Sequence, residues 1–392
     1  MTHSLTPQLY SAPPRHNVNS GYYLRHHGCT QALRYFLLYK RPSLRGENLA
    51  QVIILKTLQM VIRRAAAGLT LLVGLMGSAS ADDSSAGIFG LRNQNPFLQI
   101  YGLPTFQSAD LAETGHPTWG LSLDLANHAD FGETDIENFN IDGETYFLTL
   151  SLRRRVTDWL ELGFDVPFVS HQDGFMDDMI EGWHDTFGMS NTKRRGPSNE
   201  MSFLYQRNGE DIYRLESSAS GLGDIQLTAA IPLREEGDGP WRISVRSSLK
   251  LPTGDANKLL GSGGTDLAVG LFATRTGSMF DRPLVLNGFA GGFALSDGDL
   301  LPDLQRDAIA YGGAAATWHW NEWFSLAAQL YGQTPYYDSD VEELGGSSMQ
   351  LAVGAMFRTR GNSLFRIAVV EDVSANTTTD FALHFSLLMG GG

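Results

Sequence analysis

The sequence predicts an all-β protein: an antiparallel transmembrane up-and-down β-barrel of about twelve strands, with short periplasmic turns and long outer loops. Three observations support this prediction. Apolar and polar residues alternate with period two, the alternating segments are about 9–14 residues long, and the connections between them are alternately long and short. Strands of soluble sheets are typically about 5–6 residues long, whereas a tilted strand needs about 9–11 residues to cross a bilayer. The segment lengths therefore favour a membrane barrel over a soluble sandwich.

The composition excludes several other classes of protein. The chain has 392 residues, of which 42% are hydrophobic and 18% are charged, so it has enough apolar side chains to fold. No apolar run approaches the roughly 18 residues of a membrane-spanning helix, and a single cysteine cannot support a disulfide framework. The formal net charge of −14 argues against nucleic acid as a partner.

Residues 60–81 have the layout of a secretory signal peptide. A pair of arginines leads into an apolar stretch over 65–76, and the small residues 79–81 form a cleavage site before Asp82. We therefore expect export through a cleaved signal peptide. We interpret 1–59 as a non-native upstream extension, translated from an earlier start codon.

The segment 82–116 precedes the first expected strand. Pro96 and Pro104 argue against a central strand here, because proline cannot donate a hydrogen bond to a neighbouring strand. Three interpretations stay open at this stage. The segment is a periplasmic N-terminal tether, a small plug inserted into the barrel, or an extra edge strand over 97–106.

The barrel itself is expected over 117–388. Residues 160–166 illustrate its pattern, since apolar side chains there alternate with Glu161, Gly163 and Asp165. Bacterial single-chain barrels have an even number of strands, and twelve satisfies that requirement. The expected strands cover residues 117–128, 142–155, 158–170, 221–234, 240–251, 265–276, 284–295, 309–320, 323–333, 348–360, 363–371 and 378–388.

Connection lengths and tryptophans assign the two ends of the expected barrel. Connections after odd-numbered strands are long and those after even-numbered strands are short, as in a barrel whose two termini lie in the periplasm. Tryptophans gather near the expected periplasmic ends, where an interfacial aromatic girdle would lie. They are Trp119, Trp159, Trp241, Trp318, Trp320 and Trp323.

Four motifs together resemble an uncharacterised family of Gram-negative proteobacteria, known only as a domain of unknown function. They are the runs Arg92-Asn93-Gln94-Asn95-Pro96-Phe97, Glu181-Gly182-Trp183-His184-Asp185-Thr186-Phe187-Gly188 and Gly221-Leu222-Gly223-Asp224-Ile225, and the end Glu371-Asp372-Val373 followed by Thr379-Asp380-Phe381. The resemblance spans nearly all of the chain after the signal peptide. It implies an outer-membrane-type β-barrel and supplies no activity.

Charged residues of both signs fall on the inward face of the expected strands. The candidates for lining the lumen are Asp124, Glu161, Asp165, Arg246, Lys250 and Arg366. Mixed charge inside a barrel has two uses: ion pairs can fill a narrow lumen, or a charged ring can select a solute. Twelve strands allow either use, because eight close around side chains and sixteen leave a wide channel.

The connection 171–220 is too long to be a passive link. Four apolar residues recur there at a spacing of four, among acidic residues, and this pattern predicts a short amphipathic helix. The helix either lies over the barrel mouth as a lid or packs on the rim. Its apolar residues are Phe175, Met179, Trp183 and Phe187.

Two further features follow in the same connection. The basic turn of Lys193, Arg194 and Arg195 is a candidate for binding lipopolysaccharide phosphates, since arginine presents a fork that suits them, and the alternative is a solvated run of charge. Residues 201–208 and 211–216 are expected to form a hairpin.

The sequence gives little support for catalysis, a cofactor or a metal. His384 and Ser386 share one face of a strand, but that face points inward, and the sequence identifies no acidic partner for them. Asp297, Asp299 and Asp303 lack the oxygen spacing of a calcium loop. We therefore expect a protein that is not an enzyme and binds neither a cofactor nor a metal.

These observations predict an outer-membrane barrel that acts as a narrow or gated channel, or as a binding barrel, for a small solute. The 171–220 connection would control access. A second hypothesis is a closed barrel with a structural or adhesive role through its outer loops, and a third is a lipid-active enzyme. The expected partners are outer-membrane lipid, lipopolysaccharide, the outer-membrane assembly machinery and the small solute.

Overall fold

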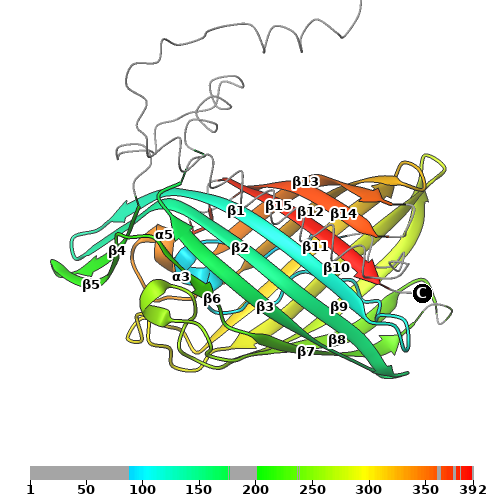
Figure 1. Ribbon diagram of the computed structural model, residues 1–392, viewed down its shortest axis with the longest axis horizontal. Coiled ribbons are helices and arrows are strands. Elements are labelled where there is room, and N and C mark those ends of the chain that lie inside the picture. The colour runs from blue at the N-terminus through cyan, green and yellow to red at the C-terminus, as the bar shows by residue number, and fades with distance from the viewer. Residues whose placement is uncertain are drawn as a thin grey trace, which may run out of the picture. The chain divides into compact units, whose positions relative to one another are not determined.

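Twelve antiparallel strands close into a barrel in the described part of the chain (Figure 1). The computed structural model describes residues 88–174, 176, 201–235, 237, 239–359, 363–373, 377–379 and 381–390, which all belong to one compact unit. The expected upstream extension and signal peptide lie outside these residues. The wall strands are β1 (Thr118–Glu133), β2 (Glu137–Thr157), β3 (Leu160–Gln172), β7 (Gln226–Arg234), β8 (Arg242–Lys250), β9 (Asp266–Met279), β10 (Arg282–Ala294), β11 (Ala308–His319), β12 (Phe324–Gln333), β13 (Ser348–Arg358), β14 (Leu364–Asp372) and β15 (Phe381–Gly390).

Each wall strand pairs with its neighbour along the chain, and β1 pairs with β15 to close the ring. The closing register runs from Thr118 opposite Gly390 to Asn127 opposite Phe381. Closure leaves the wall without a free edge, which satisfies the backbone hydrogen bonds that a membrane interior cannot. The twelve predicted strands are thereby confirmed, with bounds that differ by a few residues.

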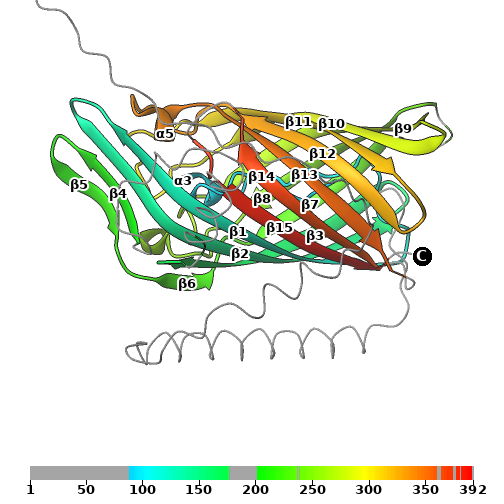
Figure 2. The same cartoon turned by 90° about the horizontal axis from the view of Figure 1, so that it is seen from above.

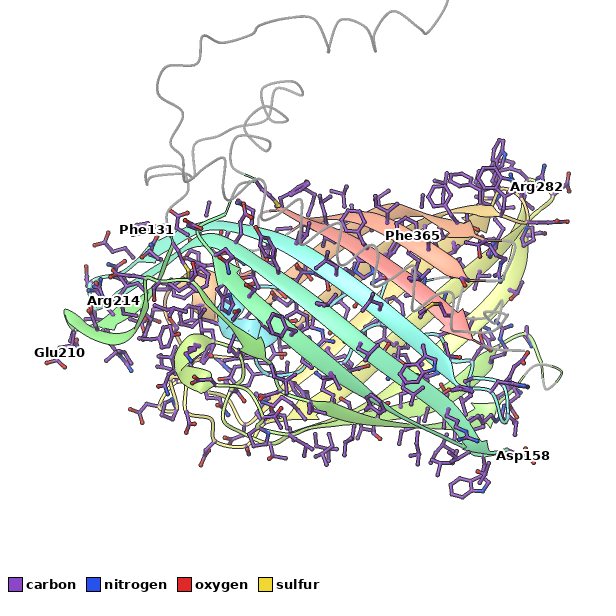
Figure 3. All side chains as sticks on the ribbon, viewed as in Figure 1. Phe131, Asp158, Glu210, Arg214, Arg282 and Phe365 are labelled. Atoms are coloured by element: carbon purple, nitrogen blue, oxygen red, sulfur yellow. The ribbon has the colours of Figure 1, made fainter. Side chains whose placement is uncertain are left out.

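The two ends of the barrel differ. At one end, which we call the short-turn end, β2–β3, β9–β10 and β11–β12 are joined by two to four residues. The opposite, long-loop end carries the connections 251–265, 295–307 and 334–347, with the short helices η2 (Ala256–Lys258) and α5 (Glu342–Gly345). Figure 3 shows Asp158 and Arg282 at the short-turn end, and Glu210 and Arg214 at the other.

The first connection at the long-loop end is a correction to the sequence prediction. Residues 129–141 were expected to form a long loop, but β1 and β2 continue as a paired hairpin with only 134–136 between them. Beyond Asn127 of β1 the strand has no β15 partner, and before Glu144 the β2 strand has no β3 partner. This hairpin therefore projects past the barrel wall.

Three short strands extend the sheet beside this projection. β4 (Ser202–Arg207) pairs with the projecting part of β2 and with β5 (Glu210–Leu215), which confirms the hairpin predicted there. β6 (Ala219–Leu222) pairs with the outer end of β3 and leads into β7. Figure 1 shows β4 and β5 reaching beyond the wall strands.

The outward faces of the wall strands form an apolar belt. Side chains such as Leu162, Leu227, Leu271 and Val353 alternate with inward-facing residues and are each about half exposed, and Phe365 is one of them in Figure 3. Trp159, Trp241, Trp320 and Trp323 are exposed at the short-turn end. This arrangement matches the apolar band and aromatic girdle of barrels that span a bilayer. None of the described helices has the length and apolar character to cross a membrane.

Residues 88–112 fill the interior, and we call them the lumen segment. They include the short helix α3 (Pro96–Gln99), and most of their side chains are buried. In both Figure 1 and Figure 2, α3 lies within the outline of the strands. The segment pairs with no neighbour as a strand over 97–106, so the extra-strand alternative is wrong. Its apolar side chains pack on inward-facing aromatic residues, among them Phe139, Phe203, Phe272, Phe289, Phe293, Tyr311, Tyr331, Tyr336 and Tyr337.

Candidate functional site

Local sequence chemistry shapes the first part of the lumen segment. The Asn95 side chain accepts a hydrogen bond from the Phe97 N–H (3.0 Å) and caps α3, while Pro96 occupies its first position, where no N–H is needed. Asn93 accepts from the Asn95 N–H (2.9 Å) and donates to Ser348 Oγ (3.2 Å). This Asn-x-Asn-Pro run therefore both starts the helix and attaches it to the long-loop end of the wall.

The turn after α3 rests against a buried cluster of charge. Lys250 Nζ lies 3.0 Å from Asp224 Oδ2 and 2.7 Å from Asp266 Oδ2, and it donates to the Ile100 carbonyl oxygen at 3.2 Å. The chain turns at Gly102 with a φ of +62°, and a Cβ there would lie 2.8 Å from Lys250 Cδ. Only glycine suits this position, since it combines a left-handed backbone with close contact.

A second ion pair holds the returning part of the lumen segment near the short-turn end. Arg246 Nη1 lies 2.8 Å from Glu161 Oε1. Arg246 Nε donates to the Ser108 carbonyl oxygen (2.9 Å), and the Ala112 N–H donates to Glu161 Oε2 (2.6 Å). Both charged side chains are buried, so the segment completes a hydrogen-bonded network that the wall alone would leave open.

Two neighbouring ion pairs play different roles. Arg242 reaches across to Asp110 of the lumen segment. Arg153 Nη2 lies 2.9 Å from Asp165 Oδ2, and its other hydrogen bonds go to carbonyl groups of the wall strands. The first pair therefore joins the segment to the wall, while the second stays within the wall.

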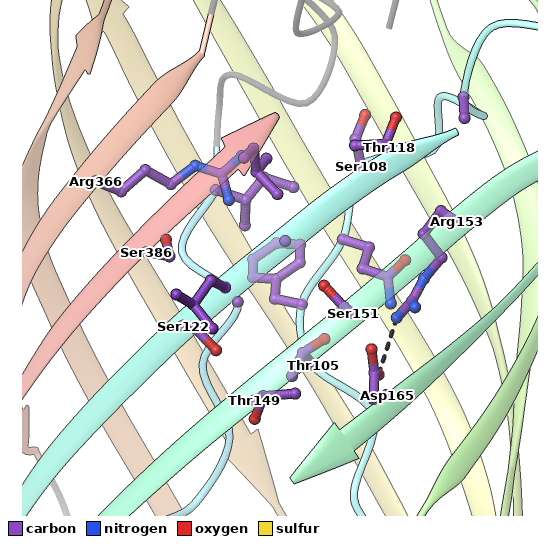
Figure 4. Close-up of a pocket in the computed structure, with 18 of the residues that line it drawn as sticks. Thr105, Ser108, Thr118, Ser122, Thr149, Ser151, Arg153, Asp165, Arg366 and Ser386 are labelled. Atoms are coloured by element: carbon purple, nitrogen blue, oxygen red, sulfur yellow. Dashed lines mark hydrogen bonds and ion pairs between the residues drawn. The ribbon is translucent and has the colours of Figure 1, made fainter. Parts of the chain in front are cut away.

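A cavity of about 170 Å³ lies between the lumen segment and the wall formed by β1, β2, β14 and β15 (Figure 4). Its lining reaches Thr118 and Leu388, which lie near the short-turn end. Thr105 and Ser108 face it from the lumen segment. The charged and nucleophilic side chains around it include Arg153, Asp165, Arg246, Arg366, His384 and Ser386.

One wall of this cavity carries a hydrogen-bonded series of three side chains. Asp124 Oδ1 lies 2.6 Å from His384 Nδ1, and His384 Nε2 lies 3.1 Å from Ser386 Oγ. Asp124 and His384 face each other across the closing β1–β15 pair. The sequence identified no acidic partner for His384, and this was wrong, because that partner lies on the strand farthest away along the chain.

The structure places all six predicted lumen residues inside the barrel, where each is at most 9% exposed. It brings Glu161 together with Arg246, whereas Asp165, Lys250 and Asp124 pair with residues outside this predicted set. Those partners are Arg153, Asp224, Asp266 and His384. The predicted lid residues Phe175, Met179, Trp183 and Phe187 and the basic residues Lys193, Arg194 and Arg195 lie outside the described residues.

The sequence analysis also did not predict Asp110 and Ser108 of the lumen segment as site residues. They follow two prolines and show no period, so no local pattern marks them as inward-facing. Among the described residues, no three His, Cys, Asp or Glu side chains are grouped as ligands for a metal ion would be.

A closed antiparallel barrel with an apolar outer belt and a filled interior defines a protein of the outer-membrane β-barrel class. The chain belongs to the family described as "protein of unknown function (DUF3187)", whose model matches residues 69–390. This confirms the resemblance to an uncharacterised barrel family. A comparison with curated proteins gives no match.

Several solved structures are similar to this chain, each with a TM-score below 0.5. The COG4313 outer membrane channel from Pseudomonas putida F1 has 15% identity and a TM-score of 0.49, covering 72% of this chain and 99% of that one. The NanC porin has 8% identity and a TM-score of 0.38, covering 70% and 99%. The DcaP channel of Acinetobacter baumannii has 10% identity and a TM-score of 0.30, covering 73% and 99%.

Proposed function

We propose that this protein is an outer-membrane barrel that binds and passes a small polar solute, with the lumen segment as its gate. The apolar belt and the exposed tryptophans support placement in a bilayer. The short-turn end would then face the periplasm, where single-chain barrels have their short turns. Residues 60–81 supply the expected export signal.

The observation that carries this proposal is how the lumen segment is held. It adds no strand to the wall, and side chains of the wall hold it, chiefly Arg242, Arg246, Glu161 and Lys250. Withdrawal of the segment would leave every wall strand paired as before. This separability supports a gate rather than a permanent core.

The cavity beside the segment suggests what the barrel would bind. Its volume of about 170 Å³ suits a small molecule, and its lining presents both charged and hydroxyl groups. Arg366 and Arg153 face it from the wall, and Arg92 faces it from the segment. A small solute that carries a carboxylate or a comparable acceptor would find donors here.

The experiment is to lock the lumen segment to the wall by a reversible covalent bond. Ser108 Oγ and Thr274 Oγ1 are 3.1 Å apart, so the double variant S108C/T274C places two sulfur atoms within bonding reach. The native cysteine, Cys29, precedes the expected mature chain and does not interfere. Conductance of the refolded 82–392 chain is recorded in a planar lipid bilayer under oxidising and then reducing conditions.

We expect discrete openings in the wild-type chain and in each single-cysteine control. The oxidised double variant should lose these openings and regain them on reduction. Heat-modifiable gel migration verifies that each barrel is folded. Openings that persist in the oxidised lock, or a folded wild-type barrel that never conducts, would contradict the gate.

A second candidate function is a closed barrel that acts through its long-loop end. The projecting β1–β2 hairpin, extended by β4 and β5, favours it, since Ile136 and Ile212 are about half exposed there. The proposed lipopolysaccharide contact of Lys193, Arg194 and Arg195 would belong to the same end of the barrel. This function would be favoured if the folded protein shows no conductance in the bilayer and binds lipopolysaccharide.

A further inference from the structure

We propose that Ser386, His384 and Asp124 form a hydrolytic site inside the barrel that cleaves small carboxylic esters. Ester hydrolysis is an activity beyond solute passage. It depends on different residues from those that hold the lumen segment in place. It also departs from the expectation, drawn from the sequence, that the protein is not an enzyme.

The three side chains occupy the order and spacing that a nucleophile, a base and an orienting acid require. His384 Nε2 lies 3.1 Å from Ser386 Oγ, and His384 Nδ1 lies 2.6 Å from Asp124 Oδ1. A carboxylate at Nδ1 fixes the proton there and leaves the Nε2 lone pair directed at the serine hydroxyl. Such sites are recognised by geometry and role, independently of the fold.

The backbone makes this arrangement rigid. Ser386 follows His384 by two residues in β15, so both side chains point to the same side of the wall. Asp124 stands directly opposite His384 in the β1–β15 register. The ring of Phe89, from the lumen segment, packs edge-on against His384 with the ring centroids 6.1 Å apart.

Ser386 has suitable neighbours for stabilising a developing negative charge. Its register partners are Arg366 in β14 and Ser122 in β1, and all three residues line the cavity. Directly opposed residues on paired strands have Cβ atoms about 4.5–5.5 Å apart, so a guanidinium and a hydroxyl flank the nucleophile. Figure 4 shows Arg366, Ser122 and Ser386 grouped on one side of the cavity.

The cavity also sets the class of substrate. It holds about 170 Å³, with Ile88, Leu111 and Leu388 supplying apolar lining beside the polar groups. A short acyl chain fits the apolar part, while the ester carbonyl lies between Ser386 and Arg366. Long-chain lipids are too large for this volume, so the substrate is a small ester reaching the cavity from the short-turn end.

The reaction consumes one ester and one water. Ser386 Oγ attacks the carbonyl carbon while His384 Nε2 takes the hydroxyl proton, and the carbonyl electrons move to the oxygen. When they return, the bond to the alkoxy oxygen breaks, and His384 gives its proton to the departing alcohol. Water then attacks the carbonyl carbon of the acyl–serine ester while His384 takes one of its protons. As the carbonyl electrons return, the bond to Ser386 Oγ breaks, His384 returns the proton to that oxygen, and a carboxylic acid and free Ser386 are released. Asp124 acts as a positioning residue throughout.

The first test uses diisopropyl fluorophosphate on the folded barrel of residues 82–392. An activated serine displaces fluoride and gains a phosphoryl group, which intact mass and peptide mapping detect. We expect labelling of Ser386 that S386A abolishes and D124N slows by about a thousandfold or more, since the loss of a triad aspartate costs ~10⁴ in rate. The matched control is S248A, which removes another buried, inward-facing serine and should leave labelling unchanged.

A further measurement tests whether reagents can reach the site. The variant S386C, treated with a small methanethiosulfonate reagent, reports whether the site can be reached. Modification of S386C without labelling of wild-type Ser386 would show that the serine is reachable but not activated, and would overturn the proposal. Failure to modify S386C in the folded barrel would also overturn it, because substrate could not reach the site.

Two variants separate positioning from mere stability. H384Q removes the base, so the labelling of Ser386 should be lost while the barrel stays folded by gel migration. Hydrolysis of p-nitrophenyl acetate should follow the same order across the variants. A D124N barrel that labels at the wild-type rate would assign Asp124 and His384 a purely structural role.

Discussion

Arg246 and Glu161 form an ion pair across two strands that lie on either side of β7, and each also hydrogen-bonds the backbone of the lumen segment. Their charges are compensated only partly by each other. The Ser108 and Asp110 carbonyl oxygens, Gln107 Oε1 and the Ala112 N–H provide further hydrogen bonds. The wall and the segment are therefore coupled, so that a change at either charged residue affects both.

The coupling predicts that R246M destabilises the folded barrel and releases the segment. Removing one partner of a buried ion pair costs about 3–5 kcal/mol, because the other charge stays buried. Hydrogen exchange of the amides over 106–112 should accelerate by about tenfold or more, since 1.4 kcal/mol corresponds to a factor of ten. Mass spectrometry of the exchanged peptide measures this effect.

The matched control for that prediction is R153M. Arg153 and Asp165 form a pair of similar length in which Asp165 is buried and Arg153 is largely buried, but their hydrogen bonds stay within the wall. R153M should lower stability by a comparable amount and leave exchange over 106–112 near the wild-type rate. Equal acceleration in both variants would mean that global stability, rather than the Arg246 contacts, holds the segment.

The Lys250 cluster predicts a large difference between two lysines that are close in sequence. K250M leaves Asp224 and Asp266 buried without their cation, and should cost about 3–5 kcal/mol. K258M removes only the exposed pair with Asp255 (3.1 Å) and should cost less than about 1 kcal/mol. Urea denaturation in lipid vesicles, followed by tryptophan fluorescence, compares the two. Similar midpoints would refute the structural role of Lys250.

Glu137 makes the attachment of the β4–β5 hairpin depend on pH. It lies in the projecting part of β2, beyond the wall, and its carboxylate accepts from Tyr205 Oη (2.5 Å), the Asp340 N–H (2.9 Å) and Ser339 Oγ (3.1 Å). Burial of this carboxyl favours the neutral form, but the hydrogen bonds outweigh burial and hold the pKa of Glu137 below its ordinary value of 4.5.

Because folding lowers the pKa of Glu137, its ionised carboxylate stabilises the attached hairpin fully at pH values well above 4.5. This stabilisation is lost as the pH falls through the pKa of Glu137 in the folded state. E137Q should therefore speed hydrogen exchange over 202–215 at pH 7, and the difference from wild type should shrink at pH 3. Exchange rates are corrected for their intrinsic pH dependence. A difference that stays constant between these pH values would rule out the carboxylate as the cause.

The apolar belt predicts that a charge on the outer face is costly only in the middle of a strand. Leu271 lies within β9 and is 50% exposed, so L271R should cost about 2–4 kcal/mol in a bilayer. Phe280 is 81% exposed in the β9–β10 turn, and F280R should be nearly neutral. Folding yields in lipid vesicles, read from heat-modifiable gel migration, test both variants. Equal yields would argue against a lipid-facing belt.

The wall of the barrel could be predicted from the sequence because its signal is local. Period-two alternation and turn spacing depend only on neighbouring residues, so the twelve strands and the 201–216 hairpin were found. The loop expected at 129–141 was wrong, because these residues pair as strands past the ends of β15 and β3. Phe139 and Ile141 alternate with polar residues there and are fully buried, so the apolar pattern continued beyond the expected end of the strand.

The candidate site was harder to predict from the sequence, since it depends on contacts between residues that are distant along the chain. Asp124 and His384 are 260 positions apart, and no local pattern gives the register of the strand pair that closes the barrel. Residues 88–112 lack a period because they are shaped by the lumen around them. One signal was present: Asn95 before Pro96 is a helix start, and it marks the position of α3.

The described part of the lumen segment runs to the long-loop end and back. Near Phe89 it contacts Gln329 midway along β12, at Asn93 and Ile100 it reaches the long-loop end, and by Ala112 it has returned to the short-turn end, where β1 begins. Within the described residues the segment thus doubles back inside the lumen. Its return at Ala112 leads into β1, so the chain that fills the barrel is continuous with the strand that closes it.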